Sequence, residues 1–165
     1  MKSFLHHWRW PLLTAVILLF GAFLTVWRYK LPEVQDPSPQ GFSGVQAMNT
    51  LRYLLPNDKP HPRGSEEHAA VIRRLVARLK SMGLQPEVQV EEATSPFGHT
   101  GWVENVLVHF PGETEDIILV TAHTDSVPTG PGAADDGQGV AIMVELAGYL
   151  KDKKRHNPVT LLFTD

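Results

Sequence analysis

The stretch that decides the fold is His123-Thr-Asp-Ser-Val-Pro-Thr-Gly-Pro-Gly-Ala-Ala-Asp-Asp-Gly-Gln-Gly139, a loop rich in glycine and proline between two apolar runs. The run before it, Ile117–Ala122, predicts a buried strand, and the run that starts at Val140 predicts a helix. The imidazole and the carboxylates of the loop therefore lie at the carboxyl end of a strand. Because open α/β sheets bind their ligands at that end, the stretch predicts a ligand site.

The polar residues of this stretch suit a metal ion. His123 and Asp125 lie two residues apart, and because side chains alternate along a strand, both point to the same side. Asp135 and Asp136 follow beside glycines, where the backbone can bend closely around an ion. Imidazole nitrogen and carboxylate oxygen are zinc ligands, and the chain has no cysteine that could supply a thiolate. The alternative for the acidic pair is that one aspartate caps the following helix.

Strands and helices are predicted on both sides of the loop. Apolar runs and alternation predict four strands: 86–92, 103–110, 116–122 and 158–164. Apolar periodicity predicts three helices in the same part of the chain: 44–55, 66–82 and 138–153. Ser43 and Ser65 are expected to cap the first two helices, and Gly83 is expected to end the second.

These elements indicate the fold class. A strand, the aspartate loop, a helix and a further strand form a crossover unit, which implies a parallel pair of strands. We therefore predict an α/β fold with a mixed, largely parallel sheet flanked by helices. In this arrangement the strand 158–164 is expected to be an apolar edge of the sheet.

The amino-terminal part of the chain predicts a membrane anchor. Residues 10–27 carry no charge, they begin and end with tryptophan, and basic residues stand on both sides. A cleaved signal peptide is the alternative, but its apolar core is usually about 7–15 residues and ends in a small-x-small site. We predict a short tail (1–9), a single transmembrane anchor (10–27), a proline-rich linker (28–41) and a domain over 42–165.

The composition of the 165 residues excludes some partners. The chain has 18 acidic and 15 basic residues and no long basic run, so nucleic-acid binding has no electrostatic basis. The length allows about one domain and an appendage.

The loop resembles the zinc-site segment of the M28 family of metallopeptidases, an aminopeptidase group with a co-catalytic pair of zinc ions. The pattern is His-Thr-Asp-Ser-Val-Pro-x-Gly-Pro-Gly-Ala-x-Asp-Asp-Gly-x-Gly-Val-Ala, starting at His123. The similarity runs from Phe42 to the last residue, with supporting stretches at Phe42-Ser43, His61-Pro-x-Gly64-Ser65, Met82-Gly-Leu84 and Glu104-Asn105-Val106. It is strongest to membrane-anchored members. The M20 peptidases also have a His-x-Asp after a strand, but their next segment differs.

The resemblance implies a role for each polar residue of the loop. His123 would ligate one zinc ion, and Asp135 would bridge two zinc ions. Asp125 would sit behind His123 as a catalytic residue, while Asp136 would be structural. The fold implied is that of the zinc exopeptidases, here incomplete.

The resemblance also implies a function. The expected activity is that of a zinc-dependent exopeptidase of the aminopeptidase type, acting on peptides with a free amino terminus. The anchor would hold the peptidase domain at a membrane, on its non-cytoplasmic side. Two alternatives remain: a glutaminyl cyclase-like zinc acyltransferase, and a non-catalytic M28-like binding domain.

The chain departs from the M28 pattern after its last predicted strand. In that family the strand runs directly into a Gly-Glu-Glu segment, which supplies the general base and a zinc ligand, and two further ligands come later. His123 and Asp135 alone leave both ions short of the three or so protein ligands that a catalytic zinc needs. We therefore expect this chain to be the amino-terminal part of a longer protein and to be inactive alone.

Several other polar residues are further candidates for site residues. Surface or packing roles are predicted for five isolated histidines: His61, His68, His99, His109 and His156. The pair His6 and His7 is expected at the membrane interface. A structural hydrogen bond is predicted for Glu145, and no nucleophile motif supports Ser126.

Overall fold

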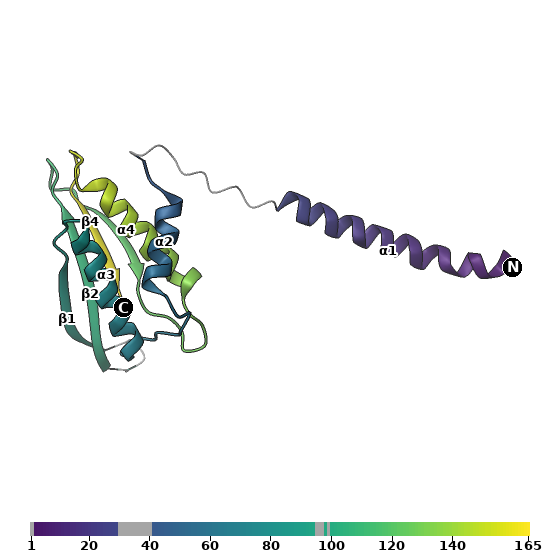
Figure 1. Cartoon of the computed structure of the whole chain (residues 1–165), viewed down its shortest axis with the longest axis horizontal. Coiled ribbons are helices and arrows are strands. Elements are labelled where there is room, and N and C mark those ends of the chain that lie inside the picture. The colour runs from purple at the N-terminus through teal and green to yellow at the C-terminus, as the bar shows by residue number, and fades with distance from the viewer. Residues whose placement is uncertain (1, 30–40, 95–97, 99) are drawn as a thin grey trace. The chain divides into compact units, whose positions relative to one another are not determined.

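The computed structural model describes residues 2–29, 41–94, 98 and 100–165 (Figure 1). The chain divides into two units, one ending at Val34 and one beginning at Gln35. The predicted linker, 28–41, lies almost wholly outside the described residues, as does His99.

The first unit contains one long helix, α1 (Lys2–Arg28). Within it, Trp10–Arg28 has a mean hydropathy of 2.0 and is long and apolar enough to cross a membrane. The predicted anchor falls inside this segment, and the residues of the predicted tail from Lys2 onward continue the helix. The hydroxyls of Thr14 and Thr25 donate to backbone carbonyls of the preceding turn. These polar side chains therefore have partners inside the helix, which suits an apolar environment.

The described residues of the second unit form a four-stranded sheet. Its strands are β1 (Glu87–Thr94), β2 (Thr100–Phe110), β3 (Ile118–His123) and β4 (Val159–Thr164), in the order β1-β2-β4-β3. β3 and β4 are parallel, as the crossover predicts, while β1 with β2 and β2 with β4 are antiparallel. The predicted mixed sheet is confirmed. The prediction that it is largely parallel is wrong, because two of its three pairings are antiparallel.

The edges of the sheet also differ from the prediction. β4 lies between β2 and β3, so it is an inner strand and not the expected edge. β3 is at the edge, and Ile118 and Leu119 are 52% and 57% exposed, although their run was predicted to be buried. The sequences of β3 and β4 are similarly apolar. Only the antiparallel pairing of β4 with β2 decides that β4, and not β3, is enclosed.

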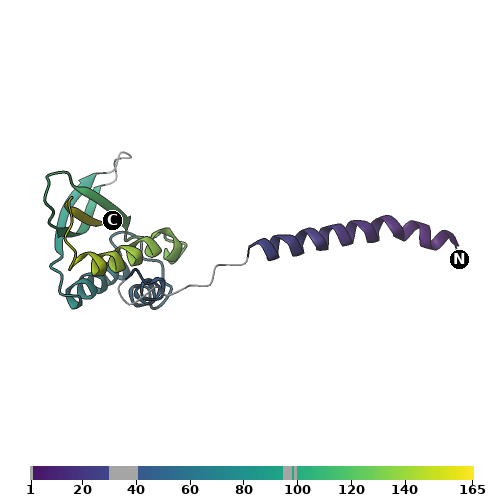
Figure 2. The same cartoon turned by 90° about the horizontal axis from the view of Figure 1, so that it is seen from above.

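The described part of this unit also contains three helices: α2 (Gly44–Leu54), α3 (Glu66–Ser81) and α4 (Gln138–Leu150). All three lie on the same side of the sheet, where α3 and α4 contact the strands and α2 packs on α4 (Figure 2). Alternate residues of β2 and β4 point to these helices and form the core with α3 and α4: Val106, Val108, Phe110, Val159, Leu161 and Phe163. The fold is therefore α/β, with a covered face and a second face on which His109 is exposed.

The predicted helix ends are confirmed. The hydroxyl oxygen of Ser43 accepts a hydrogen bond from the backbone N–H of Gln46, and that of Ser65 accepts one from His68, both at 3.1 Å. Gly83 follows α3 with a φ of 79°, a left-handed conformation that glycine adopts without a steric cost.

We expect Ser65→Ala to lower the free energy of unfolding by about 1 kcal/mol, because the N–H of His68 loses its partner. Ser81→Ala is the control, because its exposed hydroxyl only donates to the carbonyl of Arg78 at the other end of α3. Urea denaturation of both variants checks this prediction. An equal loss in Ser81→Ala would contradict it.

Candidate metal centre

The site is built where β3 ends and α4 begins. β3 ends at His123, a loop follows, and a single wide turn, Ala133–Gly137, leads directly into α4. His123 pairs with Thr164 at the carboxyl end of β4, so the site lies at the carboxyl edge of the parallel pair. This is the edge at which α/β sheets bind ligands.

The structure brings the three predicted site residues together. The Nδ1 atom of His123 lies 3.0 Å from Oδ1 of Asp125, and its Nε2 atom lies 3.1 Å from Oδ1 of Asp135. The side chain of His123 is 38% exposed and that of Asp135 is 90% exposed. The imidazole is therefore held between two carboxylates at a position open to solvent.

Asp136 has a different role. Its Oδ2 atom accepts a hydrogen bond from the backbone N–H of His123 at 3.3 Å, across the loop. A Cβ atom on Gly139 would lie 2.2 Å from Oδ1 of Asp136, so the glycine leaves room for this carboxylate. The peptide bond between Asp135 and Asp136 is cis. The hydrogen bond of Asp136 thus ties the loop to the end of β3.

The protonation of His123 reflects its neighbours. Partial burial by itself lowers the pKa of His123, but the hydrogen bonds with Asp135 and Asp125 and the charge of the nearby carboxylates outweigh it. The pKa of His123 is therefore raised from its ordinary value. In the metal-free chain the raised pKa of His123 stabilises the folded state at pH values below the ordinary pKa of histidine. This contribution to the free energy of unfolding is lost as the pH rises through the raised pKa.

A pH dependence of zinc binding follows, because zinc requires the neutral imidazole. We expect zinc affinity to rise as the pH increases, with release of a proton, until His123 is deprotonated. Asp135→Asn should lower the pKa of His123 in the metal-free protein, since one of the interactions that raise it is lost. An NMR titration of the imidazole checks the shift, and an unchanged midpoint in Asp135→Asn would contradict it.

The donor atoms fit zinc in kind. His123 offers an imidazole nitrogen and Asp135 a carboxylate with two accessible oxygens, and both are common zinc ligands. Within the described part of the chain, no group of three or more His, Cys, Asp or Glu side chains is arranged to hold a metal ion together. His123 and Asp135 are thus the two candidate ligand side chains among the described residues, and Asp125 contacts the other ring nitrogen of His123.

The loop that carries the site packs on the segment before α3. The hydroxyl oxygen of Ser126 accepts a hydrogen bond from the N–H of His61 at 2.7 Å, and the N–H of Ser126 donates to the carbonyl of His61. The ring of His61 is 2% exposed, and its Cε1 atom would lie 3.2 Å from a Cβ atom on Gly132. His61 and Ser126 therefore shape the loop, and the packing role predicted for this histidine is confirmed.

The other candidates also have structural or surface positions. Glu145 accepts a hydrogen bond from the N–H of Ser43 at 3.2 Å, so the predicted structural role is confirmed. His109 and His156 are exposed. His68 is buried and contacts Thr124 and Asp165, a cluster that sequence reasoning missed. Its members lie far apart in the chain, and no periodic pattern connects them.

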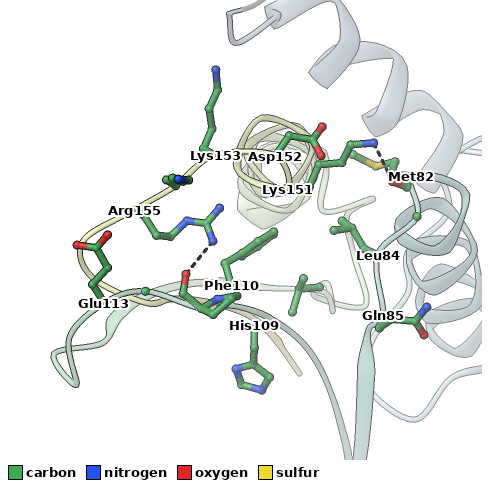
Figure 3. Close-up of a pocket in the computed structure, with 15 residues that line it drawn as sticks. Met82, Leu84, Gln85, His109, Phe110, Glu113, Lys151, Asp152, Lys153 and Arg155 are labelled. Atoms are coloured by element: carbon green, nitrogen blue, oxygen red, sulfur yellow. Dashed lines mark hydrogen bonds between the residues drawn. The ribbon is translucent and has the colours of Figure 1, made fainter.

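A large cavity of about 660 Å³ lies at the other end of the sheet (Figure 3). It is lined by three segments: 82–85, 108–113 and 151–155. Phe110 in this cavity pairs with Val159 at the start of β4, whereas the site lies at the end of β4. Arg155 donates to the carbonyl of Pro111, and Lys151 donates to that of Met82. Both cations hold neighbouring loops together, and the cavity is separate from the metal centre.

Solved structures place this architecture among zinc exopeptidase-like folds. The glutaminyl cyclase of Porphyromonas gingivalis is 30% identical, with a TM-score of 0.66 over 75% of this chain and 45% of that one. A leucine aminopeptidase precursor from Bacteroides thetaiotaomicron is 20% identical, with a TM-score of 0.65 over 79% of this chain and 48% of that one. The fold class predicted from the sequence is thereby confirmed, except for the prediction that most strand pairs of the sheet are parallel.

Sequence comparison matches part of the chain to a peptidase family. Residues 105–165, which include β3, the loop, α4 and β4, match peptidase family M28. A vacuolar membrane protease of Schizosaccharomyces japonicus is 32% identical over 92% of this chain and 19% of its own length. One of Laccaria bicolor is 29% identical over 89% of this chain and 15% of its own length. The chain thus spans less than a fifth of these two relatives.

Proposed function

We propose that this chain is the membrane-anchored, amino-terminal part of a zinc-dependent exopeptidase of the aminopeptidase type. The observation that carries the proposal is His123, held between Asp125 and Asp135 at the carboxyl end of β3. The match of residues 105–165 to peptidase family M28 and the similarity to vacuolar membrane proteases support it. The substrate would be a peptide with a free amino terminus.

The chain's own residues would prepare the centre as follows. Asp125 accepts a hydrogen bond from the Nδ1–H group of His123, which would leave the Nε2 lone pair available as a ligand. Asp135 has two carboxylate oxygens and is exposed, so it would hold the metal together with His123. Asp136 holds the backbone at His123 in place. Bound zinc would supply Lewis acidity, which polarises a water molecule and the scissile carbonyl. We propose that the centre holds two zinc ions.

The location of the activity is also proposed. Trp10–Arg28 would be a single membrane anchor, and the peptidase domain would lie on the non-cytoplasmic side. The relatives named vacuolar membrane proteases support a membrane location.

A second candidate is glutaminyl cyclisation. It is favoured by the 30% identity and the TM-score of 0.66 to the cyclase of Porphyromonas gingivalis. Both reactions begin with a peptide that has a free amino terminus, but they differ in product. A peptidase adds water and releases the first residue, while a cyclase releases ammonia and keeps every residue.

The test compares two peptides with the full-length, zinc-loaded protein in detergent. One begins with leucine and the other with glutamine, and an amino-acetylated copy of each is the control. The proposal predicts a free amino acid from the leucine peptide and none from the acetylated copies. A pyroglutamyl peptide with ammonia, and no free leucine, would replace the proposal with cyclisation. No product from either peptide would favour a binding domain.

A further inference from the structure

A buried histidine lies beneath the metal centre without being part of it. His68 is in the first turn of α3, is 3% exposed, and has its backbone N–H bound by Ser65. Its Nε2 atom lies 3.0 Å from Oγ1 of Thr124 and 3.1 Å from Oδ1 of Asp165. One ring nitrogen thus meets residues at the ends of two parallel strands, β3 and β4.

The donors and acceptors of this cluster determine where the proton lies. The hydroxyl of Thr124 donates to the carbonyl of Thr164 at 2.9 Å, so its oxygen can only accept from His68. The Nε2 atom of His68 therefore carries a hydrogen that points to Thr124. Oδ1 of Asp165 is close enough for an ion pair but lacks the alignment of a hydrogen bond. The other oxygen of Asp165 accepts from the N–H of Glu104 at 2.7 Å.

Thr124 connects this cluster to the centre, because it is the residue between His123 and Asp125. Side chains alternate along an extended backbone, so Thr124 points into the protein while its two neighbours point to the site. Both the N–H and the hydroxyl of Thr124 donate to the carbonyl of Thr164, at 2.7 and 2.9 Å. His68 holds the hydroxyl from the other side, which fixes the backbone that sets the spacing of His123 and Asp125.

We propose that His68 is a positioning residue of the metal centre, acting through Thr124 on His123 and Asp125. This inference rests on the proposed function, since it assumes that the centre binds zinc. A residue that only fills space would contribute to stability alone. A positioning residue also changes metal affinity, and loss of such outer partners typically weakens it about 10–100-fold.

The test measures zinc affinity by chelator competition on the full-length protein, at a temperature where each variant is folded. We expect His68→Ala to weaken zinc binding at least tenfold. His68→Gln should restore most of this affinity, because its amide nitrogen can donate in the place of Nε2. Leu79→Ala is the matched control: it is buried in the same helix, packs in the core, and should destabilise the protein without changing zinc affinity.

A double-mutant cycle tests the route through Thr124. Thr124→Val keeps the shape of the side chain and removes the acceptor, so it should weaken zinc binding as much as His68→Ala does. The two losses should not add in the double variant. This variant also tests the inference if His68→Ala does not fold.

Several outcomes would overturn the inference. Wild-type affinity in either His68→Ala or Thr124→Val would show that the cluster only packs, and additive losses would show that His68 does not act through Thr124. An equal loss in Leu79→Ala would show a general effect of stability. If these variants bind zinc normally while His123→Ala does not, only the positioning role fails. If the unaltered protein binds no zinc, the proposed function fails as well.

Discussion

His123→Ala is expected to abolish tight zinc binding and to lower kcat/KM for peptide hydrolysis by the full-length protein about a thousandfold or more. In the proposed centre the side chain of His123 would supply the nitrogen ligand, and its removal also deprives Asp125 and Asp135 of their contact with the imidazole. A catalytic zinc contributes several kcal/mol of transition-state stabilisation, and each 1.4 kcal/mol or so corresponds to a factor of about ten. Zinc content by atomic absorption and release of free amino acid check the two parts of this expectation.

The matched control is His156→Ala. The side chain of His156 is 75% exposed, and its Nδ1 atom lies 3.5 Å from Oε2 of Glu113. It lies at the end of the sheet where β4 begins. Removing it should leave zinc content and hydrolysis unchanged. Full activity in His123→Ala would remove this residue from the centre, and an equal loss in His156→Ala would mean that the assay reports folding.

Gly132→Ala is expected to lower the free energy of unfolding by about 2–4 kcal/mol and to disturb the site. Gly132 has a φ of 65°, a conformation that strains any residue with a Cβ atom. That Cβ atom would also lie 2.7 Å from Cβ of Ser126, which is held by His61. The loop between Asp125 and Asp135 must therefore move, and the two carboxylates would no longer meet the imidazole of His123.

Gly130→Ala is the control within the same loop. The nearest atom to its added Cβ is a methyl carbon of Val127 at 3.7 Å, an ordinary contact, so stability should change by less than about 0.5 kcal/mol. Thermal denaturation and zinc affinity of the two variants check the comparison. Equal stability of the two variants would contradict the role of the left-handed glycine.

The sequence contains enough information for the elements and for the place of the site. Ser43, Ser65 and Gly83 mark helix ends through local hydrogen bonds and backbone conformation, which act within a few residues. The order of the strands in the sheet cannot be predicted from the sequence pattern. β3 and β4 are both short and apolar, and the pairing of β4 with β2, between residues 49 to 57 positions apart, decides which of the two strands is enclosed.

The contacts of the candidate site also differ in whether the sequence predicts them. His123 and Asp125 share a side because of strand alternation, which is local and predictable. The distance between His123 and Asp135 depends on the shape of the loop, and His68 reaches Thr124 across 56 positions of the chain. Such contacts arise from tertiary packing, so no pattern of residues along the chain reveals them.

The exposed strand β3 links the pairing of strands in the sheet to the binding of metal at the candidate centre. Within the described residues β3 pairs with β4 alone, and the same strand ends at His123. A segment that adds to this edge would extend the sheet and arrive beside the imidazole. Any ligand carried by such a segment would enter the centre as the strands pair. Binding of the metal and extension of the sheet at this edge would then be thermodynamically coupled, so that zinc would stabilise the strand pairing and the pairing would raise the affinity for zinc.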